Sequence, residues 1–398
     1  MAVYLDHAAT TPIRPEVLAA YTDALGTVGN PSSIHGAGQA ARDLLESGRE
    51  RIAAAFGADA VEVVLTGGGT EAVNLGVKGL YWARQSGAAR PRILTTRAEH
   101  HATLDAVEWL VAHEGAVVDW IPVDSDGVIR LSSLEAALES PGDVALVTSL
   151  WANNEVGSIQ PVAEISTLAA RAGVPLHLDA IAAAGSVPID FHASGAAALS
   201  LSAHKLGAPV GVGALLVARS ATVEPLLHGG SQQRARSGTM DAAGAVAFGE
   251  AAALAAAELP EHAARLASLR DRLLAGVAAI PGAAVRGARD GDVPGERRLP
   301  GNVHATYAGC EGDALLLLLD RDGIRVSTGS ACQAGVPEAS HVLRAMGVPD
   351  DEARGALRVT LGWDSTDADV DAVLAALLAA VETARGAGLA ARTPALGR

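Results

Sequence analysis

Lys205 is the residue whose type and surroundings point most directly to covalent chemistry. It is one of only two lysines, the other being Lys78, in a chain of 398 residues. It follows the small apolar run 195–199, and glycines stand at 207, 211 and 213. Because an ammonium is poorly hydrated in such surroundings, we expect its pKa to lie below the usual value of about 10.4. A neutral amine can form a Schiff base with a carbonyl compound, although the same stretch also fits a lysine that reaches the surface beside a turn.

A glycine-rich turn at 66–71, Thr-Gly-Gly-Gly-Thr-Glu, is the second chemical feature. It separates a predicted strand at 61–65 from a predicted helix at 72–85. Such a turn presents backbone N–H groups to an anion such as phosphate. No Gly-Lys-Ser/Thr follows it, and its glycine spacing is not that of a dinucleotide-binding turn. The alternative is a tight turn that needs glycine only for its backbone conformation.

Polar side chains follow several predicted strands at their carboxyl ends. These are Thr70, His100, Asn154 and Asp179. The strands alternate with helices along the chain, which indicates an α/β domain, and ligands of such domains bind at the carboxyl ends of the strands. We therefore expect the four residues to converge, although each alone also fits a loop residue or a helix cap.

An amine, an anion cradle, a carboxylate and a histidine are together what pyridoxal phosphate requires. Its aldehyde takes a lysine, its phosphate takes backbone N–H groups and hydroxyls, and its pyridine nitrogen takes a carboxylate. The carboxylate keeps that nitrogen protonated, so that the ring can accept electrons from a carbanion. The sequence therefore favours a pyridoxal-phosphate enzyme.

Longer stretches carry a more specific pattern. They are Ser-Ala-His-Lys at 202–205, Ala-Asn-Asn-Glu-Val-Gly at 152–157, Arg-Ser-Gly-Thr at 236–239 and Ser-Thr-Gly-Ser-Ala-Cys at 327–332. With the stretches 4–12 and 357–362, they make the chain resemble the cysteine desulfurases, which supply sulfur for iron–sulfur clusters and tRNA thiolation. The resemblance covers nearly the whole chain. It implies fold type I of the pyridoxal-phosphate-dependent transferases, as in the class V aminotransferases: an α/β large domain with a mixed, mostly parallel seven-stranded sheet flanked by helices, and a smaller α+β C-terminal domain.

The resemblance also implies roles at the cofactor. Lys205 forms the Schiff base and later moves protons at the substrate, Asp179 pairs with the pyridine nitrogen, and His100 stacks on the ring as an acid/base. The phosphate is held by backbone, hydroxyl and imidazole groups of Gly69, Thr70, Ser202 and His204. Thr239 reaches the phosphate of a neighbouring subunit, which implies a homodimer.

For the substrate, the resemblance implies L-cysteine. Arg358 binds the substrate carboxylate with two parallel hydrogen bonds, and Asn154 holds that carboxylate or the cofactor's ring oxygen. Cys332 attacks the substrate sulfur and carries it away as a persulfide, leaving alanine, before a protein acceptor takes the sulfur. A loop of small residues suits this movement, and a free thiol has a pKa near 8.5, so that only a small fraction is thiolate at neutral pH. Cys310, the other cysteine, fits a buried structural role better.

Three features depart from the family pattern. Ala182 stands where the family usually carries a glutamine that hydrogen-bonds the cofactor's ring oxygen. The loop 228–239 is one residue short, and Ala203 replaces a glycine before His204, where its methyl group would crowd the cofactor. We expect these departures to weaken the activity or to shift it to a related substrate.

Two alternatives therefore stay open. One is a selenocysteine lyase or another β-eliminating lyase on the same fold, against which Cys332 argues because simple elimination needs no acceptor thiol. The other is a catalytically degenerate homologue that serves as a sulfur-assembly partner.

Composition sets outer limits. The net charge is −15, from 30 basic and 45 acidic residues, with no basic run, so nucleic acid is not an expected ligand. No uncharged apolar run reaches the length of a membrane span, and residues 1–7 lack the features of a signal peptide, so we expect a cytoplasmic protein without a membrane partner. His100 and His101 lack further ligands at metal-binding spacing, so no metal is expected.

The length and the change of composition near residue 260 predict two domains. Pro260 also predicts that the helix beginning at Ala242 ends near Leu259. We place the large domain at 13–260 and the small one at 1–12 with 261–385. Residues 386–398 are expected to be a mobile tail, and the charged stretch 286–300 is expected to be exposed.

Overall fold

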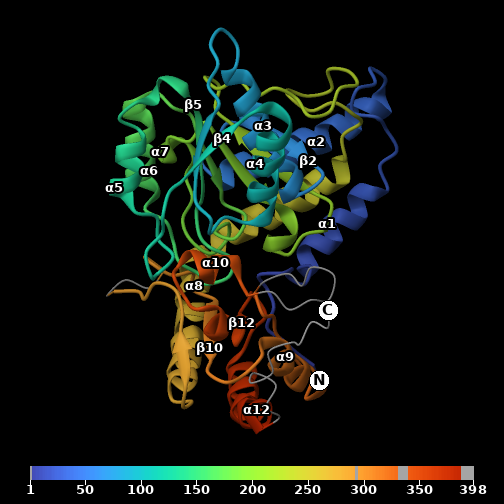
Figure 1. The fold of residues 1–398 in the computed structure, drawn as a ribbon. Coiled ribbons are helices and arrows are strands. Elements are labelled where there is room, and N and C mark those ends of the chain that lie inside the picture. Colours follow the sequence, from blue (N-terminus) through green and yellow to red (C-terminus); the bar gives the residue numbers. More distant parts are fainter. Residues whose placement is uncertain (1, 292–294, 330–338, 387–398) are drawn as a thin grey trace, which may run out of the picture.

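One large sheet organises the molecule (Figure 1). The computed structural model describes residues 2–291, 295–329 and 339–386. Its seven-stranded sheet has the order β2-β8-β7-β6-β5-β3-β4, in which β8 is antiparallel to both neighbours and the other pairs are parallel. The strands are β2 Val63–Thr66, β3 Arg92–Thr95, β4 Val117–Trp120, β5 Val144–Leu150, β6 Leu176–Asp179, β7 Ala198–Ser202 and β8 Gly213–Val217. This is the mixed, mostly parallel sheet that the family resemblance implied.

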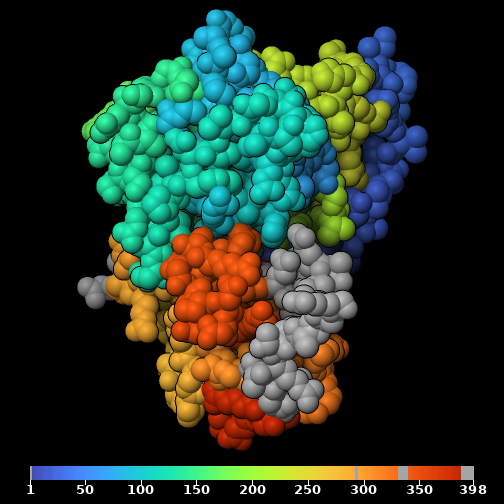
Figure 2. Space-filling model, in the orientation of Figure 1, coloured from blue at the N-terminus to red at the C-terminus, as the bar shows by residue number. Residues whose placement is uncertain are grey.

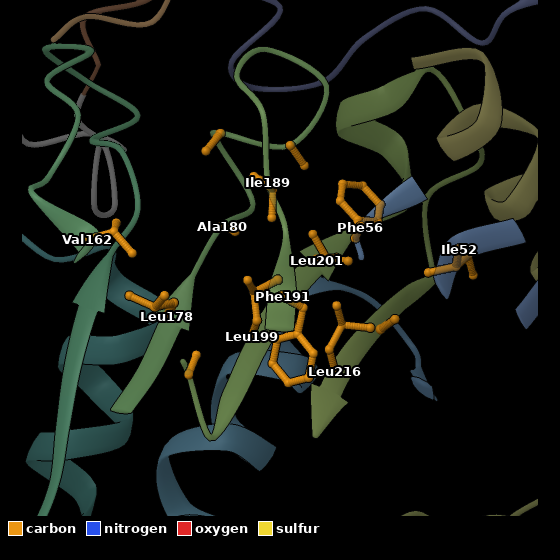
Figure 3. Packing of buried hydrophobic residues seen from close by; sticks show 14 of the residues in the cluster. Ile52, Phe56, Val162, Leu178, Ala180, Ile189, Phe191, Leu199, Leu201 and Leu216 are labelled. Carbon is orange, nitrogen blue, oxygen red and sulfur yellow. The ribbon is translucent and has the colours of Figure 1, made fainter. Parts of the chain in front are cut away.

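Helices cover both faces of this sheet, which explains why its central strands are apolar throughout. All seven residues of β5 are buried, as in parallel strands between helical layers. Helices α3 and α4 pack on one face, and α2, α6, α7 and α8 on the other. The helices are α1 Pro15–Leu25, α2 Gly36–Ala55, α3 Gly69–Arg84, α4 His101–Glu114, α5 Leu131–Ala137, α6 Val162–Ala172, α7 Phe191–Ser194 and α8 Ala242–Ala278. Figure 3 shows part of the larger core, where Phe56 and Phe191 lie near Leu199, Leu201 and Leu216.

The crossing of α2 and α8 depends on two glycines. A Cβ on Gly48 would lie 2.5 Å from the carbonyl carbon of Ala245, and a Cβ on Gly249 would lie 2.7 Å from the carbonyl oxygen of Gly48. Glycine at these positions lets the two helix backbones touch, which brings the long α8 against the main core.

A second, smaller group of elements occupies the lower part of Figure 1. Its antiparallel sheet has the order β12-β10-β9, and β1 pairs in parallel with β11, so the N-terminal strand belongs with C-terminal elements. The strands are β1 Val3–Tyr4, β9 Ala283–Val285, β10 Asn302–Tyr307, β11 Ile324–Arg325 and β12 Ala356–Thr360. The helices are α9 Gly312–Arg321, α10 His341–Ala345, α11 Asp350–Ala353 and α12 Asp367–Gly386.

Helix α8 joins the two groups. Its residues 245–255 pack in the large core, and residues 266–277 pack in the core of the smaller group. The domain boundary predicted at residue 260 therefore lies inside this helix. The groups also meet through α10, where Val342 and Leu343 contact Ala98 and Val123. In Figure 2 the orange surface around α10 lies directly against the cyan surface of the large group.

Two sequence predictions were wrong in this region, one of them only in part. We expected a helix to end near Leu259 because Pro260 follows, yet α8 runs through Pro260 for 37 residues. Proline removes one hydrogen bond, and packing of both halves on two cores keeps the helix continuous. The expectation that the stretch 286–300 is exposed was wrong only in part. Arg289, Glu296 and Arg297 are exposed, but Arg298 is buried and its Nε donates to the carbonyl of Ala288 at 2.6 Å.

Helix α8 is also the one helix among the described residues that is long and apolar enough to cross a membrane. Half of the residues in the most apolar stretch of α8 are buried inside the molecule. Such burial is typical of the core helix of a globular protein.

Candidate active site

A cavity of about 370 Å³ lies at the carboxyl ends of β5, β6 and β7, where the fold class places ligand sites. The residues predicted to act together line it: Gly69, Thr70, His100, Asn154, Asp179, Ser202, His204, Lys205 and Arg358. The structure thus brings together side chains from both groups of elements, because Arg358 comes from β12 and the others from the large sheet and its loops.

Lys205 lies in the short 3-10 helix Ala203–Leu206, which follows β7 directly and ends at Gly207 with a φ of +82°. Its ammonium donates to the carbonyl of Ala8 and, at 2.8 Å, to the carbonyl of Ala9. Burial first, and then the charge of Arg358, lower the pKa of Lys205 to about 8. The predicted loss of hydration is confirmed, and about one tenth of the amine is neutral at pH 7.

Asp179 is the last residue of β6 and is 2% exposed. One carboxylate oxygen accepts the backbone N–H of Ile181 at 3.0 Å. Burial raises the pKa of Asp179 to about 6, although this hydrogen bond and Lys205 act in the opposite direction. A carboxylate held in this way gains most from a cationic partner inside the cavity.

His100 caps the N-terminus of α4. Its Nδ1 accepts the backbone N–H of Ala102 at 3.0 Å, so in the neutral ring the proton is on Nε2. Burial, followed by the charge of Lys205, lowers the pKa of His100 to about 4. The imidazole is therefore neutral at physiological pH and offers an N–H to the cavity.

An anion site lies where α3 begins. The helix starts at Gly69, three residues earlier than predicted, and its N-cap Gly68 has a φ of +141°. No side chain caps this helix end, so its first N–H groups are available to a ligand. Ser202 Oγ is buried beside it without a hydrogen-bond partner among the described residues. His204 hydrogen-bonds Thr10 Oγ1 at 3.1 Å, and burial lowers its pKa to about 4.

Arg358 reaches the cavity from β12, and its side chain is 5% exposed. Its Nη2 pairs with the Asp6 carboxylate at 2.7 Å, and its Nη1 donates to the carbonyl of Asn154 at 3.1 Å. The guanidinium fork is therefore oriented before any substrate binds, which suits recognition of a carboxylate.

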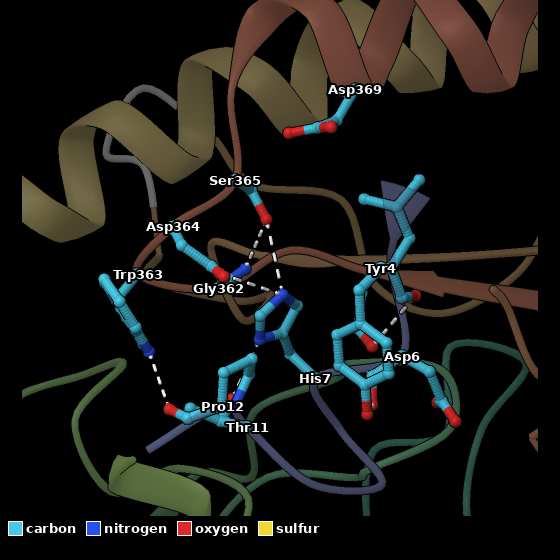
Figure 4. Close-up of polar contacts among 12 residues, drawn as sticks. Tyr4, Asp6, His7, Thr11, Pro12, Gly362, Trp363, Asp364, Ser365 and Asp369 are labelled. Carbon is cyan, nitrogen blue, oxygen red and sulfur yellow. Dashed lines mark hydrogen bonds and ion pairs between the residues drawn. The ribbon is translucent and has the colours of Figure 1, made fainter. Parts of the chain in front are cut away.

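Ala8 and Ala9 line the cavity, and the neighbouring His7 anchors their segment through the polar contacts in Figure 4. His7 Nδ1 hydrogen-bonds Thr11 Oγ1 at 2.9 Å, and its Nε2 lies 3.4 Å from the Asp364 carboxylate. The ring lies against Gly362, where any side chain would overlap it. The anchored segment then holds its carbonyls in reach of Lys205.

Sequence reasoning missed several residues of this site. It assigned no role to Asp6, to the carbonyls of Ala8 and Ala9, or to the buried Glu99, which precedes His100 but does not itself line the cavity. Burial raises the pKa of Glu99 to about 8, so this carboxyl is protonated at neutral pH. The available signal was the N-terminal stretch 4–12, which supported the family resemblance although its contacts were not foreseen.

The cavity does not test the roles predicted for two residues. Cys332 falls outside the described residues, while Ser327 and Gly329, which precede it, line the cavity. Thr239 is exposed and does not line the cavity, so its contact with a neighbouring subunit stays a prediction. Cys310 is buried, as expected, and burial raises the pKa of its thiol.

The three departures differ in their surroundings. Ala182 lines this cavity and also a second one, of about 90 Å³, whose lining includes His7 and His262. Ala203 is fully buried in the large core and does not line the cavity, and its effect on the cofactor stays a prediction. The loop 228–239 is tied to β2 by Gln233, whose Nε2 donates to the carbonyl of Leu65 at 2.7 Å.

Comparison with known proteins agrees with this geometry. The family model for class-V aminotransferases matches residues 3–373. An IscS-like cysteine desulfurase from Mycobacterium tuberculosis is 54% identical over 98% of both chains. Cysteine desulfurase IscS from Methanosarcina thermophila is 41% identical over 94% of this chain and 90% of the relative. The chain belongs to the cysteine desulfurases of the class-V aminotransferase family.

Solved structures of the family have the same fold. A NifS-like protein superposes with a TM-score of 0.87 at 33% identity and covers 96% of this chain and 100% of its own. SspA in complex with cysteine superposes with a TM-score of 0.75 at 30% identity over 90% of this chain and 98% of its own.

Cysteine desulfurases depend on pyridoxal phosphate, and the residues of this cavity fit that cofactor. The uncapped start of α3 and the unpaired Ser202 Oγ suit a phosphate. The buried Asp179 suits a protonated ring nitrogen, and the amine of Lys205 suits the aldehyde. The enzyme is therefore pyridoxal-phosphate-dependent, and the chain supplies each group that the cofactor needs.

Proposed function

We propose that this cysteine desulfurase converts L-cysteine to L-alanine and transfers the sulfur to Cys332 as a persulfide. The observation that carries the proposal is the convergence of Lys205, Asp179 and Arg358 on one cavity. An amine with a lowered pKa, a buried carboxylate and a guanidinium fork are the set that an amino-acid substrate and the cofactor require together.

The bound cofactor supplies an electron sink that stabilises negative charge at the substrate Cα. Asp179 would hold its ring nitrogen protonated. Ser202 Oγ and the N–H groups of Gly69 and Thr70 would hold its phosphate. Pairing with a cation lowers the pKa of a buried carboxylate, so cofactor binding keeps Asp179 ionised.

Two residues move protons. Lys205 Nζ, with its pKa lowered to about 8, accepts the proton from the substrate Cα and returns a proton as alanine forms. His100 is neutral and carries its proton on Nε2, from which it donates to groups inside the cavity. The carbonyls of Ala8 and Ala9 orient the amine between these transfers.

Arg358 binds the substrate carboxylate, and Asn154 also lines the cavity. Because Nη1 and Nη2 now bond a carbonyl and Asp6, the substrate carboxylate must displace or share these partners. This exchange is less costly than ordering a free arginine, since the fork is already held.

Cys332 receives the sulfur. Its thiolate attacks the substrate sulfur, so that an S–S bond forms while the C–S bond breaks and its electron pair remains on carbon. That carbon takes up one proton and becomes the methyl group of alanine. Cysteine plus the thiol thus gives alanine plus a persulfide, and no outside oxidant or reductant is needed.

We further propose a cytoplasmic homodimer that passes the sulfur to a protein acceptor for iron–sulfur cluster assembly or thiolation. The IscS names of several relatives support the pathway. The ion pair of Arg236 and Glu71, at 2.9 Å, supports a role for the loop 228–239 at the cofactor, because it ties that loop to the start of α3. Thr239 would extend from this loop to the neighbouring phosphate.

The deciding assay gives the cofactor-loaded enzyme L-cysteine and a reductant. We expect equal amounts of alanine and sulfide from the wild type and neither from Cys332→Ala. Pyruvate and ammonia from both proteins would establish a β-eliminating lyase instead. Absence of any product from the wild type would establish a degenerate homologue.

A further inference from the structure

His304 is an anomaly in the small domain. It lies on β10, is 0% exposed, and neither of its ring nitrogens has a hydrogen-bond partner among the described residues. An unpaired polar atom in a protein interior costs free energy and calls for an explanation. The other fully buried histidine of the described chain, His177, shows the usual arrangement, because Thr148 and Ser200 pair with its two nitrogens at 2.9 and 2.8 Å.

The backbone places His304 next to Arg358. The two residues are directly opposite each other in the antiparallel pair of β10 and β12. The backbone groups of Arg358 bond Ser327, at 2.6 and 3.1 Å, and the carbonyl of His304 bonds Arg286. The pair is therefore of the kind without mutual backbone bonds, in which Cα atoms are about 4.5 Å apart and side chains come closest.

The same register puts Ser327 on the other side of Arg358. Ser327 and Arg358 line the active-site cavity, and His304 stands one strand behind them. A Cβ on Gly329 would lie 3.5 Å from His304 Nε2, so the imidazole also faces the start of the loop after Ser327. His304 is thus in reach of the site but outside its lining.

The charges around His304 keep its ring neutral. Burial first, and then Arg358, Arg298 and Arg286, lower its pKa to about 3. The ring is therefore neutral and one of its nitrogens is a hydrogen-bond acceptor. Arg298 and Arg286 already use their Nε groups on Ala288 and Thr306.

Arg358 has an unpaired hydrogen-bond donor that matches this acceptor. Its Nη1 and Nη2 are bonded, but its Nε is buried and has no partner among the described residues. An unpaired donor and an unpaired acceptor thus occur on facing side chains. The nearby carboxylate of Glu155 is bonded to Ser340 Oγ.

We propose that His304 is a positioning residue for Arg358. Its imidazole accepts the Nε–H of Arg358 when the two Nη groups turn from Asp6 and Asn154 to the substrate carboxylate. This inference rests on the proposed role of Arg358 in substrate binding. A guanidinium fixed at Nε presents both Nη groups to a carboxylate in one plane, which is the geometry of a bidentate pair.

The test compares L-alanine with ethylamine, which lacks the carboxylate, as ligands of the cofactor-loaded enzyme. Binding is read from the change in cofactor absorbance. In His304→Leu we expect the affinity for L-alanine to fall about tenfold, the effect of losing one hydrogen bond to a charged group. Ethylamine affinity stays as in the wild type. His304→Gln, which keeps an acceptor, stays within about threefold of the wild type for both ligands.

Two further readouts separate positioning from a structural role. Since leucine removes two unpaired polar atoms from the interior, the Tm of His304→Leu should equal or exceed that of the wild type, whereas His177→Leu should lower Tm. In an Arg358→Leu background, His304→Leu should cause no further loss of L-alanine affinity, because the two residues act as a unit.

Three results would overturn the proposal: unchanged L-alanine affinity in His304→Leu, an equal loss for ethylamine, or additive losses with Arg358→Leu. If His304→Leu does not fold, His304→Ala replaces it in the comparison of L-alanine with ethylamine. The same tenfold loss of L-alanine affinity is expected. Failure of the proposed function is recognised separately, because a wild type that makes no alanine from L-cysteine fails the desulfurase assay whatever its affinity for L-alanine.

Discussion

Gly213 controls the shape of the anion site without touching a ligand. It is the first residue of β8 and pairs with Thr66 on one side and Ser202 on the other. A Cβ at this position would lie 2.6 Å from the backbone carbon of Gly68, whereas ordinary contact begins at 3.4 Å. Because backbone atoms cannot swing away as a side chain does, Gly213→Ala must move the Gly68 turn by about 0.8 Å.

That movement has a calculable cost. A hydrogen bond of about 2.9 Å lengthened by this amount is no longer a hydrogen bond. Losing one such bond to a charged phosphate weakens binding by roughly 1.5–3 kcal/mol. The dissociation constant for pyridoxal phosphate should therefore rise about tenfold to a hundredfold.

The assay is titration of the cofactor-free protein with pyridoxal phosphate, followed by absorbance. Gly36→Ala is the matched control, because nothing lies within 4 Å of a Cβ at that position, and it should bind as the wild type does. Circular dichroism confirms that both variants are folded. A folded Gly213→Ala with a wild-type dissociation constant would show that the start of α3 does not hold the phosphate.

Three further predictions concern single residues. Lys205→Ala should lose both the covalently bound cofactor band and all alanine formation; a variant that keeps either would contradict the assignment of the amine. Glu99 has its folded pKa raised from 4.5 to about 8, so its contribution to stability is full below pH 4.5 and is lost as the pH rises through 8. Tm should therefore fall less between pH 5 and pH 8.5 in Glu99→Gln than in the wild type, and parallel curves would contradict the buried neutral acid. Ala182→Gln adds an amide donor to the cavity and should shift the pH at which the cofactor band changes, whereas an unchanged titration and turnover would mean that the departure at 182 has no effect.

The sequence predicted the fold well because its signals are local. The apolar run at 144–148 and the alternation of strands with helices define the parallel sheet, and the motif around Lys205 identifies the family. Helix α8 was divided wrongly at Pro260, since a local breaker was given more weight than burial on two cores, which no local signal shows.

The site was predicted in part. Strand ends gave Asn154 and Asp179, because carboxyl ends of parallel strands meet at one edge. The ion pair of Asp6 with Arg358 joins residues 352 positions apart, and the carbonyls of Ala8 and Ala9 act through the backbone. Such contacts depend on how the N-terminal segment crosses the cavity, and composition and spacing do not encode that path. The burial of Arg298 was missed for a different reason, because a charged stretch of sequence favours a prediction of exposure.

Peptide mass spectrometry can detect the transfer of sulfur to Cys332 itself. The cofactor-loaded enzyme is given L-cysteine without a reductant, free persulfides are trapped by alkylation, and the peptides that hold Cys332 and Cys310 are compared. We predict one added sulfur atom on Cys332 and none on Cys310, whose thiol is buried and has a raised pKa. Alanine formation with no added sulfur on Cys332 would show that this thiol is not the sulfur acceptor.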